Sequence, residues 1–353
     1  MKKILILFTT LLITQPAITQ ELLPIRGFAI AVPDKENVDR FVTFINEELP
    51  PRNINTLVLR VDYKFEYKSH PELIGKNALS QEEVDKIVAA CQQHNIDIIP
   101  QINLLGHQSW HSDLEMLLTV YPEFDETPHI ELPENYEWPN EDGLYCKSYC
   151  PLHPGVHEVV FALVDEIVEA FQAKAFHAGM DEVFYIGDEK CPRCSGKDKA
   201  ELFAGELTKI RNHLALSGKR LWIWGDRLLD GKTTGMGMWE ASMNNTHRAI
   251  DMIPKDIMIC DWHYVRVEPT AAYFALKGFD VATSSWRNGE VAQGQLKFLK
   301  NLRKNASEET AQHIKGMVHT SWSSVSSFLD RFYAPMDKTK LDDAVCFKML
   351  FGE

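Results

Sequence analysis

Residues 80–102 read SQEEVDKIVAACQQHNIDIIPQI, a helix signal followed closely by a strand signal. Ser80 and Glu83 have the spacing of a capping box, which marks the start of a helix. The apolar positions that follow keep helical spacing: Val84, Ile87, Val88 and Cys91. The run from Asp97 to Ile102 is apolar without alternation, as expected of a parallel strand covered on both faces. The stretch therefore predicts a helix packed beside a buried parallel strand.

The same rhythm of strand, polar loop and amphipathic helix recurs along the chain. Helical patterns cover His157–Ala170 and Lys199–Leu216, and Gly218 and Gly278 stand where helices should stop before the next strand. An open doubly wound sheet is the alternative, but no Gly-x-Gly-x-x-Gly turn follows the first strand. Eight such units favour an α/β fold of the (β/α)8 TIM-barrel type. The expected strands are Phe28–Val32, Thr56–Val61, Asp97–Ile102, Ala175–Met180, Arg220–Trp224, Ile257–Asp261, Asp280–Ser284 and Gly316–Thr320.

Composition limits the partners and the number of domains. The 353 residues carry a formal net charge of −13, which argues against nucleic acid and anionic membranes as partners. No linker or repeat divides the chain, so residues 21–353 are expected to form one barrel domain. The oligomeric state cannot be inferred from these features.

The N-terminus has the pattern of a secretory signal peptide. Met1-Lys2-Lys3 precedes an apolar run from Ile4 to Ile13 that is too short to span a bilayer. Small and polar residues follow, and cleavage is expected near Thr19 or Gln20. A lipid anchor is not expected, because no cysteine follows the apolar run. Residues 1–20 are therefore expected to be a signal peptide, which implies a periplasmic or extracellular protein without membrane insertion. The alternative is a buried first helix.

Four of the 7 cysteines fall in two close pairs, Cys146 with Cys150 and Cys191 with Cys194. Both pairs lie in segments that follow expected barrel strands. We expect all four to meet as a structural clamp, either through disulfides or around a closed zinc site. Unrelated thiols are the alternative.

Functional side chains gather where the expected strands end, which is where barrel enzymes place their chemistry. Tryptophan suits the apolar faces of sugar rings, while carboxylates and amides bind hydroxyl groups. The alternative is that large aromatic side chains only plug the mouth of the barrel. The residues at these strand ends are Asp62, Tyr63, Asn103, His107, Asp181, Glu182, Trp224, Asp226, Trp262, Tyr264, Trp286, Arg287 and Trp322.

The segment from Phe176 to Val183 reads FHAGMDEV and carries two adjacent acids, Asp181 and Glu182. Glycoside hydrolysis normally uses two carboxyl groups on opposite sides of the scissile bond. Adjacent residues can hardly take opposite faces of a sugar ring. They suit a reaction in which the substrate's own 2-acetamido oxygen attacks the anomeric carbon, one carboxyl acts as the acid, and the other orients the acetamido group. Repulsion between the two acids is expected to raise the pKa of one.

His177-Ala-Gly-Met-Asp181-Glu182 resembles the His-x-Gly-x-Asp-Glu motif of glycoside hydrolase family 20, the β-N-acetylhexosaminidases. Residues 100–107 (PQINLLGH) are similar to the family's third-strand segment, with leucine in place of proline before Gly106. The resemblance implies a (β/α)8 barrel and substrate-assisted retention, with Glu182 as general acid/base and Asp181 orienting the acetamido group. It implies that His107 and the tryptophans line the sugar site. The proposed substrate-binding set is His107, His177, Trp224, Trp262, Tyr264, Trp286, Arg287 and Trp322.

This sequence departs from the family pattern at positions expected to bind the outer hydroxyl groups of the sugar. Pro33-Asp34 stand where the family has an arginine, and Trp322-Ser-Ser replaces Trp-x-Glu. Because the usual Tyr-x-Asp after the seventh strand is missing, we expect Tyr264 to supply the phenol.

Three arginines, Arg227, Arg266 and Arg287, follow strands five to seven. They suggest an anionic sugar neighbour, with ion pairs to acids such as Asp226 or Glu290 as the alternative.

Two other classes of function are considered. One is a non-catalytic glycan-binding barrel, against which the retained acid pair counts. The other is a metal-dependent hydrolase, but the first strand offers no His-x-His pair despite 13 histidines in the chain. A glycan substrate without cofactor or catalytic metal is therefore expected, while the sugar epimer and linkage cannot be predicted.

Overall fold

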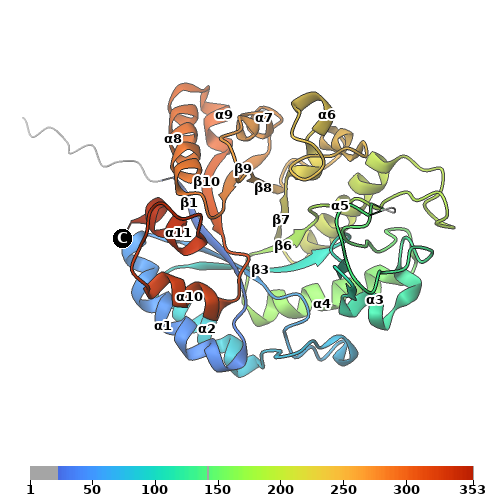
Figure 1. Cartoon of the computed structure of the whole chain (residues 1–353), viewed down its shortest axis with the longest axis horizontal. Coiled ribbons are helices and arrows are strands. Elements are labelled where there is room, and N and C mark those ends of the chain that lie inside the picture. The colour runs from blue at the N-terminus through green and yellow to red at the C-terminus, as the bar shows by residue number, and fades with distance from the viewer. Residues whose placement is uncertain (1–22, 141–142, 353) are drawn as a thin grey trace, which may run out of the picture.

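The computed structural model describes residues 23–140 and 143–352, and eight parallel strands close into a barrel (Figure 1). The strand order follows the chain, and β1 closes the ring by pairing with both β2 and β10; Phe28 lies opposite Leu57 and His319. The predicted signal peptide, residues 1–20, lies outside the described residues. The barrel strands are β1 (Ile25–Ala31), β2 (Thr56–Arg60), β3 (Asp97–Leu104), β6 (Ala175–Gly179), β7 (Arg220–Trp224), β8 (Met258–Trp262), β9 (Asp280–Ser285) and β10 (Ile314–Thr320).

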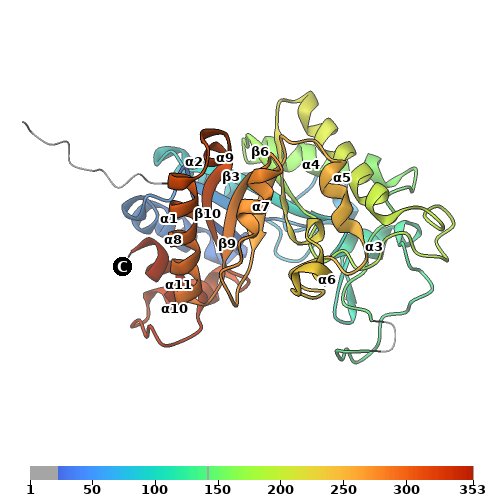
Figure 2. The same ribbon diagram turned by 90° about the horizontal axis from the view of Figure 1, so that it is seen from above.

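Helices surround the barrel, and a small hairpin of β4 (Ser109–Trp110) and β5 (Asp113–Leu114) projects from the loop after β3. Figures 1 and 2 both show α8 beside β9 and β10. No helix among the described residues is long and apolar enough to cross a membrane. The helices are α1 (Val38–Glu48), α2 (Gln81–Gln93), α3 (Met116–Val120), α4 (Val156–Ala170), α5 (Lys199–Leu216), α6 (Gly231–Thr234), α7 (Thr270–Leu276), α8 (Gly289–Asn305), α9 (Glu308–His313), α10 (Val325–Tyr333) and α11 (Asp343–Phe351).

The predicted barrel is confirmed, and each predicted strand overlaps an observed one. β7 has the predicted bounds, and the largest difference is at β1, which begins three residues earlier than predicted, at Ile25. The predicted capping box at Ser80 is present, with the Ser80 side chain accepting from the Glu83 amide. Gly218 and Gly278 have φ values of +70° and +81°, so each reverses the chain after a helix as expected.

The connection between β7 and β8 departs from the regular rhythm. In place of a full-length helix, the four-residue α6 and two 3-10 segments, Asp226–Leu228 and Thr246–Asp251, lie between these strands. Gly235 and Gly237 both adopt positive φ values, +72° and +76°, which ends α6 and turns the chain. The loop that follows carries Trp239 and Glu240 to the mouth of the barrel.

Alternation along the strands divides the core into two clusters. In β7, Leu221 and Ile223 pack outward against the helices, whereas Trp222 and Trp224 belong to a smaller cluster made by the strands' other face, inside the barrel. The barrel interior is thus filled by side chains, and an open cavity forms only above them, where the loops begin.

Candidate active site

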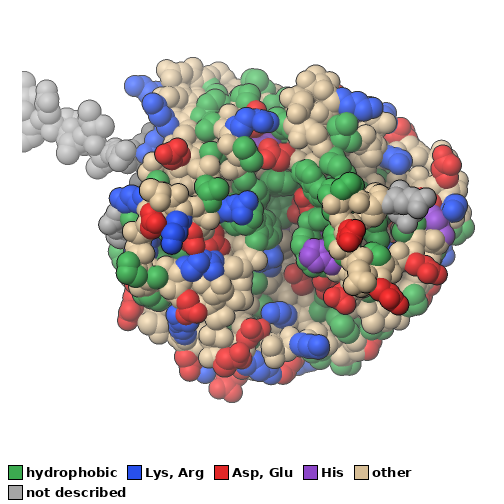
Figure 3. All heavy atoms as spheres, viewed as in Figure 1, with side chains coloured by type: hydrophobic (Ala, Val, Ile, Leu, Met, Phe, Trp, Pro, Cys, Tyr) green, Lys and Arg blue, Asp and Glu red, His purple; other side chains and the backbone are tan. Residues whose placement is uncertain are grey.

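A cavity of about 630 Å³ opens at the carboxyl ends of the barrel strands. Figure 3 shows this face hollowed near its centre, with hydrophobic side chains gathered around the hollow. Its polar floor comes from residues at or just after the ends of β2, β3 and β6, and its aromatic walls come from the loops. The lining residues are Arg60, Asp62, Tyr63, Asn103, His107, Ser109, Trp110, Glu115, Tyr145, Asp181, Glu182, Trp239, Glu240, Trp262, Tyr264, Trp286 and Trp322.

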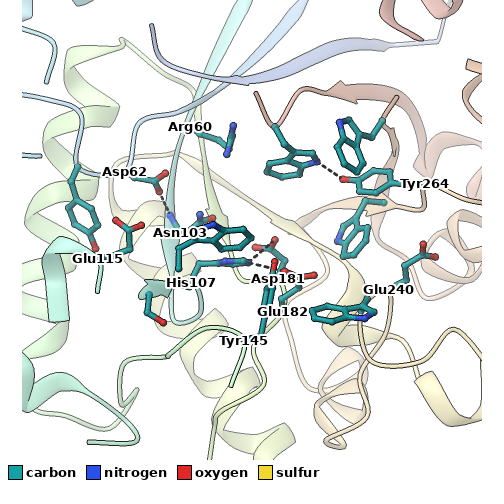
Figure 4. A pocket seen from close by; sticks show the side chains of 17 residues that line it. Arg60, Asp62, Asn103, His107, Glu115, Tyr145, Asp181, Glu182, Glu240 and Tyr264 are labelled. Atoms are coloured by element: carbon teal, nitrogen blue, oxygen red, sulfur yellow. Dashed lines mark hydrogen bonds and ion pairs between the residues drawn. The ribbon is translucent and has the colours of Figure 1, made fainter. Parts of the chain in front are cut away.

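Asp181 and Glu182 converge on one histidine. Nε2 of His107 lies 3.3 Å from Oδ2 of Asp181 and 3.4 Å from Oε2 of Glu182 (Figure 4). The three side chains are 12–14% exposed, so the group is reachable from the cavity but largely withdrawn from bulk water. Oδ1 of Asp181 is buried and has no hydrogen-bond partner among the described residues.

The backbone explains how adjacent acids reach the same place. β6 ends at Gly179, and Gly179, Met180 and Glu182 all adopt positive φ values, +67°, +70° and +48°. This breaks the alternation of the strand, so Glu182 does not point to the opposite face. A side chain at Gly179 would overlap that of Asn103 on β3, which explains the glycine in the motif. His107 is also left-handed, with φ +52°, and such strain concentrates at functional sites.

The pKa values of Asp181 and His107 each depend on the charge of the other residue. Burial raises the pKa of Asp181, but the positive charge of His107 and its hydrogen bond outweigh that effect, so the pKa is lowered overall. Burial opposes protonation of His107, yet the neighbouring carboxylates of Asp181 and Glu182 bring its pKa well above its usual value. The sequence predicts that repulsion between the two acids raises the pKa of one of them. At Asp181 this repulsion does not dominate, because the positive charge of His107 lies between the two acids.

Asp226 supports the acid pair from below. Its Oδ2 accepts hydrogen bonds from the Glu182 amide at 2.9 Å and from Nε of Arg227 at 2.6 Å, and its Oδ1 accepts from Nε1 of Trp262 at 3.2 Å. Burial, only partly offset by Arg227, raises the pKa of Asp226 to about 6. One buried carboxyl thus connects the loop after β6 to the wall of the cavity.

The side of the cavity formed by β2 and β3 is polar. Arg60 lies with its guanidinium 4.6 Å from the Trp322 ring centre, and Asp62 accepts a 2.9 Å hydrogen bond from the Asn103 amide. Figure 4 shows Asp62, Asn103 and Glu115 on this side and Tyr264 and Glu240 on the other. Burial and the charge of Asp62 raise the pKa of Glu115 to about 7.

The cavity walls bring together most, but not all, of the substrate-binding residues predicted from the sequence. His107, Trp262, Tyr264, Trp286 and Trp322 line the cavity with the acid pair. Nε1 of Trp322 donates to the Tyr264 hydroxyl at 3.2 Å.

His177, Trp224 and Arg287 are not among the lining residues. His177 and Trp224 are buried and pack on each other with ring centres 4.5 Å apart, and burial lowers the pKa of His177 to about 3. Inward-pointing strand residues lie below the mouth of the barrel, which puts this pair beneath the cavity. Arg287 is exposed and lies over the Trp286 ring, 4.1 Å from its centre.

Seven lining residues were not predicted from the sequence: Arg60, Ser109, Trp110, Glu115, Tyr145, Trp239 and Glu240. Arg60 is the last residue of β2, so the rule that strand ends carry function could have found it. The others come from loops or from the small β4–β5 hairpin, where neither spacing nor periodicity indicates which side chain turns inward. The ring of Tyr145 lies 4.8 Å from that of Trp239 and 5.2 Å from that of Trp110, forming one aromatic wall.

Two of the three arginines predicted near an anionic sugar have acidic partners. Arg227 is buried against Asp226, and Nε of Arg266 lies 2.5 Å from Oε1 of Glu268. For Arg227 and Arg266, the structure therefore favours the alternative given above, in which the arginine pairs with an acidic side chain of a loop. Arg227 also donates to three backbone carbonyls, which fixes the loop that carries Trp239.

The structure does not bring the four predicted cysteines together. Cys150, Cys191 and Cys194 meet, with Glu126 in the fourth place, whereas Sγ of Cys146 lies 3.6 Å from the backbone oxygen of Glu182. Cys146 belongs to the segment between β3 and α4 and contacts the backbone of the acid pair. Among the described residues, His107, Asp181 and Glu182 are also close enough to share a cation.

An acid pair in an aromatic cavity at the mouth of a parallel barrel defines a class of carbohydrate-processing proteins. The chain belongs to glycosyl hydrolase family 20, because residues 59–332 match the model of that family's catalytic domain.

Similar proteins carry related names. A beta-hexosaminidase of Akkermansia muciniphila is 28% identical over 152 residues, covering 41% of this chain and 29% of that protein. A beta-hexosaminidase of Vibrio furnissii is 24% identical over 236 residues, covering 65% of this chain and 32% of that protein. The chain thus spans about a third of the length of these two relatives. The structure of a beta-N-acetylhexosaminidase from Bacteroides fragilis matches with a TM-score of 0.61 at 17% identity, covering 94% of this chain and 66% of that one, which supports the barrel fold.

Proposed function

We propose that this protein is a retaining glycoside hydrolase that removes terminal N-acetylhexosamine residues, GlcNAc or GalNAc, from glycans. The observation that carries the proposal is the convergence of Asp181 and Glu182 on His107 inside an aromatic cavity. Family membership and the beta-hexosaminidase names of the relatives support it. The cavity volume of about 630 Å³ falls within the usual range for small-ligand sites.

In the proposed reaction the substrate supplies the nucleophile. Its acetamido oxygen attacks the anomeric carbon as the glycosidic bond breaks, and Glu182 gives its proton to the leaving oxygen. The oxazolinium-like intermediate is then opened by water, which returns a proton to Glu182, and the product keeps its anomeric configuration.

Asp181 suits the orienting role in this reaction. Its lowered pKa keeps it ionised at neutral pH, and it lines the cavity, where its carboxylate can accept the acetamido N–H. The negative charge offsets the positive charge that develops on the intermediate. His107 holds both acids from the opposite side, which fixes their directions before the substrate arrives.

The test is turnover of chromogenic GlcNAc, GalNAc and glucose glycosides. The N-acetylated substrates should be cleaved, and the glucoside should be essentially inert because it lacks the acetamido group. Glu182→Gln should lower kcat on the cleaved substrates by roughly 10²–10⁴-fold while binding persists in calorimetry. Glu189→Gln is the matched control, since Glu189 is exposed on the same loop and should leave turnover unchanged.

Four outcomes would contradict the proposal. Comparable hydrolysis of the glucoside, or a sugar ester trapped on the protein, would exclude substrate assistance. Binding without any turnover in the unmodified protein would instead identify a glycan-binding barrel. A divalent cation shown to bind to His107, Asp181 and Glu182 and to be required for turnover would favour a metal-dependent hydrolase.

We also propose that the protein is exported to the periplasm or the exterior, supported by the basic and apolar start of the chain. N-terminal sequencing of the mature protein should find a new terminus near Thr19 or Gln20. An intact Met1 start in the mature protein would contradict export by this route.

A further inference from the structure

A second cluster of chemically active side chains lies outside the cavity. Glu126, Cys150, Cys191 and Cys194 each place one possible ligand atom within 4.8 Å of the others. All four residues are buried, and Glu126, Cys150 and Cys194 are 0% exposed. The reaction proposed above uses none of them.

The loops around the cluster hold these residues in place. Glu126 and Cys150 lie next to the antiparallel bridge between Asp125 and Tyr149, where the Cys150 amide donates to the Phe124 carbonyl at 2.6 Å. Cys191-Pro-Arg-Cys194 forms a tight turn in which the Cys194 amide donates to Sγ of Cys191 at 3.4 Å. The Cys-x-x-Cys spacing is typical of zinc sites, and an amide donor to sulfur stabilises a thiolate.

The distances between sulfur atoms fit a metal tetrahedron better than a disulfide. Sγ of Cys150 lies 3.6 Å from Sγ of Cys191 and 3.4 Å from Sγ of Cys194. A disulfide requires about 2.05 Å between sulfurs. Tetrahedral zinc with Zn–S bonds of about 2.3 Å separates its sulfurs by about 3.8 Å. The Cys150 sulfur is therefore already separated from both other sulfurs by close to the edge length of a zinc site.

Glu126 provides the independent sign that a cation belongs here. Its Oε1 accepts the Asp188 amide at 3.0 Å, whereas no hydrogen bond of good geometry from the described residues reaches its buried Oε2, which faces the thiols of Cys191 and Cys194. A buried carboxylate oxygen without a partner is costly, and coordination to a cation removes that cost. Zinc accepts carboxylate oxygen as well as thiolate sulfur.

We propose that Cys150, Cys191, Cys194 and Oε2 of Glu126 bind one zinc ion in a closed structural site. On binding, the three thiols release their protons to solvent, and all four coordination positions are filled by protein. The site leaves no position for a substrate or an activated water. Its role is to stabilise the fold around it.

The position of the site indicates what it stabilises. Glu126 and Cys150 belong to the long loop between β3 and α4, which also carries His107 and Tyr145. Cys191 and Cys194 belong to the loop between β6 and α5, which begins with Asp181 and Glu182. The zinc ion would therefore join the loop that carries His107 to the loop that carries the acid pair.

The first experiment uses the full chain without substitution. Protein purified under reducing conditions should contain one zinc per chain by elemental analysis. After removal of the metal, titration with Co²⁺ should produce thiolate-to-cobalt charge-transfer absorption that saturates at one equivalent. Absence of both bound zinc and that absorption in reduced, folded protein would overturn the proposal, as would mass-spectrometric detection of a disulfide among these cysteines in freshly purified protein.

Variants then assign the ligands. Cys194→Ser should abolish stoichiometric zinc, and Glu126→Gln should weaken zinc affinity by at least tenfold in a chelator competition. Cys91→Ala is the matched control, because Cys91 is a buried cysteine on α2 and should retain one zinc. Full zinc affinity in folded Glu126→Gln protein would exclude the carboxylate ligand. Because metal content is the readout, the result does not depend on which substrate the protein hydrolyses.

Discussion

The backbone amide of Glu182 donates a 2.9 Å hydrogen bond to Oδ2 of Asp226, a buried residue just after β7. This contact holds Glu182 in its left-handed conformation, with φ +48°. The same carboxyl pairs with buried Arg227. The orientation of the proposed acid thus depends on a neighbouring strand as well as on its own.

Replacing Asp226 should therefore damage both stability and activity. Asp226→Ala leaves the Arg227 charge buried without its carboxylate, which should lower the unfolding free energy by about 3–5 kcal/mol. It also frees the Glu182 amide, so kcat on a GlcNAc glycoside should fall in the protein that remains folded. Urea unfolding and turnover of the soluble variant measure the two effects.

The control for this substitution is Asp256→Ala. Asp256 forms a more exposed ion pair with Arg211, and such pairs contribute about 0–1 kcal/mol. Equal losses of stability in the two variants would show that the Asp226 pair has no special role.

The hydroxyl of Tyr264 should act mainly on the chemical step. It accepts from Trp322 at the cavity wall and is the phenol best placed by sequence to replace the missing family tyrosine. Tyr264→Phe should lower kcat by roughly 10–100-fold, the range expected for one hydrogen bond that strengthens in the transition state, with little change in KM. Tyr273→Phe, on α7 away from the cavity, should behave like the unmodified protein. Unchanged turnover in Tyr264→Phe would reject this role and make Tyr145, another phenol that lines the cavity, the next residue to test.

Much of the fold was predictable because buried parallel strands carry a strong local signal. The run from Arg220 to Trp224 has the same bounds in sequence and structure, and the capping box at Ser80 starts α2 as expected. Sequence patterns predict the regular alternation of strand and helix less well where glycines interrupt them. Between β7 and β8 the chain uses Gly235 and Gly237 to form a loop, and the regular helix expected there is reduced to four residues.

The predicted site shows a similar division. Asp181, Glu182 and His107 directly follow strands, so the barrel geometry alone brings them to one mouth. Trp224 also ends a strand but points inward, and a rule based on strand ends cannot tell a side chain inside the barrel from one above it. Glu126 could not be paired with the cysteines from sequence, because the contact depends on the path of a long loop.

Sulfated substrates should be poorer than neutral ones. The cavity is lined by Asp62, Asp181, Glu182 and Glu240, while Arg227 and Arg266 are occupied by acids. A 6-sulfo-GlcNAc glycoside should therefore show a lower kcat/KM than its unsulfated counterpart, and raising the salt concentration should narrow the difference. A preference for the sulfated substrate would instead support recognition of anionic glycans, with Arg60 and Arg287 as its first candidates.

Stability should decline as the pH rises above neutrality, because of a buried histidine near the cavity. His263 lies 3.1 Å from Asp261 and 2.8 Å from Glu240. Burial opposes its charge, but these two acids raise its pKa to about 10. A raised histidine pKa contributes stability that is complete below about pH 6.5 and is lost as the pH rises toward 10. Within that window one proton gives a slope of about 1.4 kcal/mol per pH unit.

Urea unfolding at pH 6, 7, 8 and 9 measures this slope. His263→Gln should be less stable at pH 6 and should lose less stability on going to pH 9 than the unmodified protein. His107, whose pKa is also raised, contributes to the slope of both proteins and cancels in the comparison. His94→Gln, which removes a partly buried histidine bound to Asn46, should keep the original slope. Parallel curves for His263→Gln and the unmodified protein would mean that His263 does not hold its proton through this range, and that Asp261 and Glu240 are neutralised in another way.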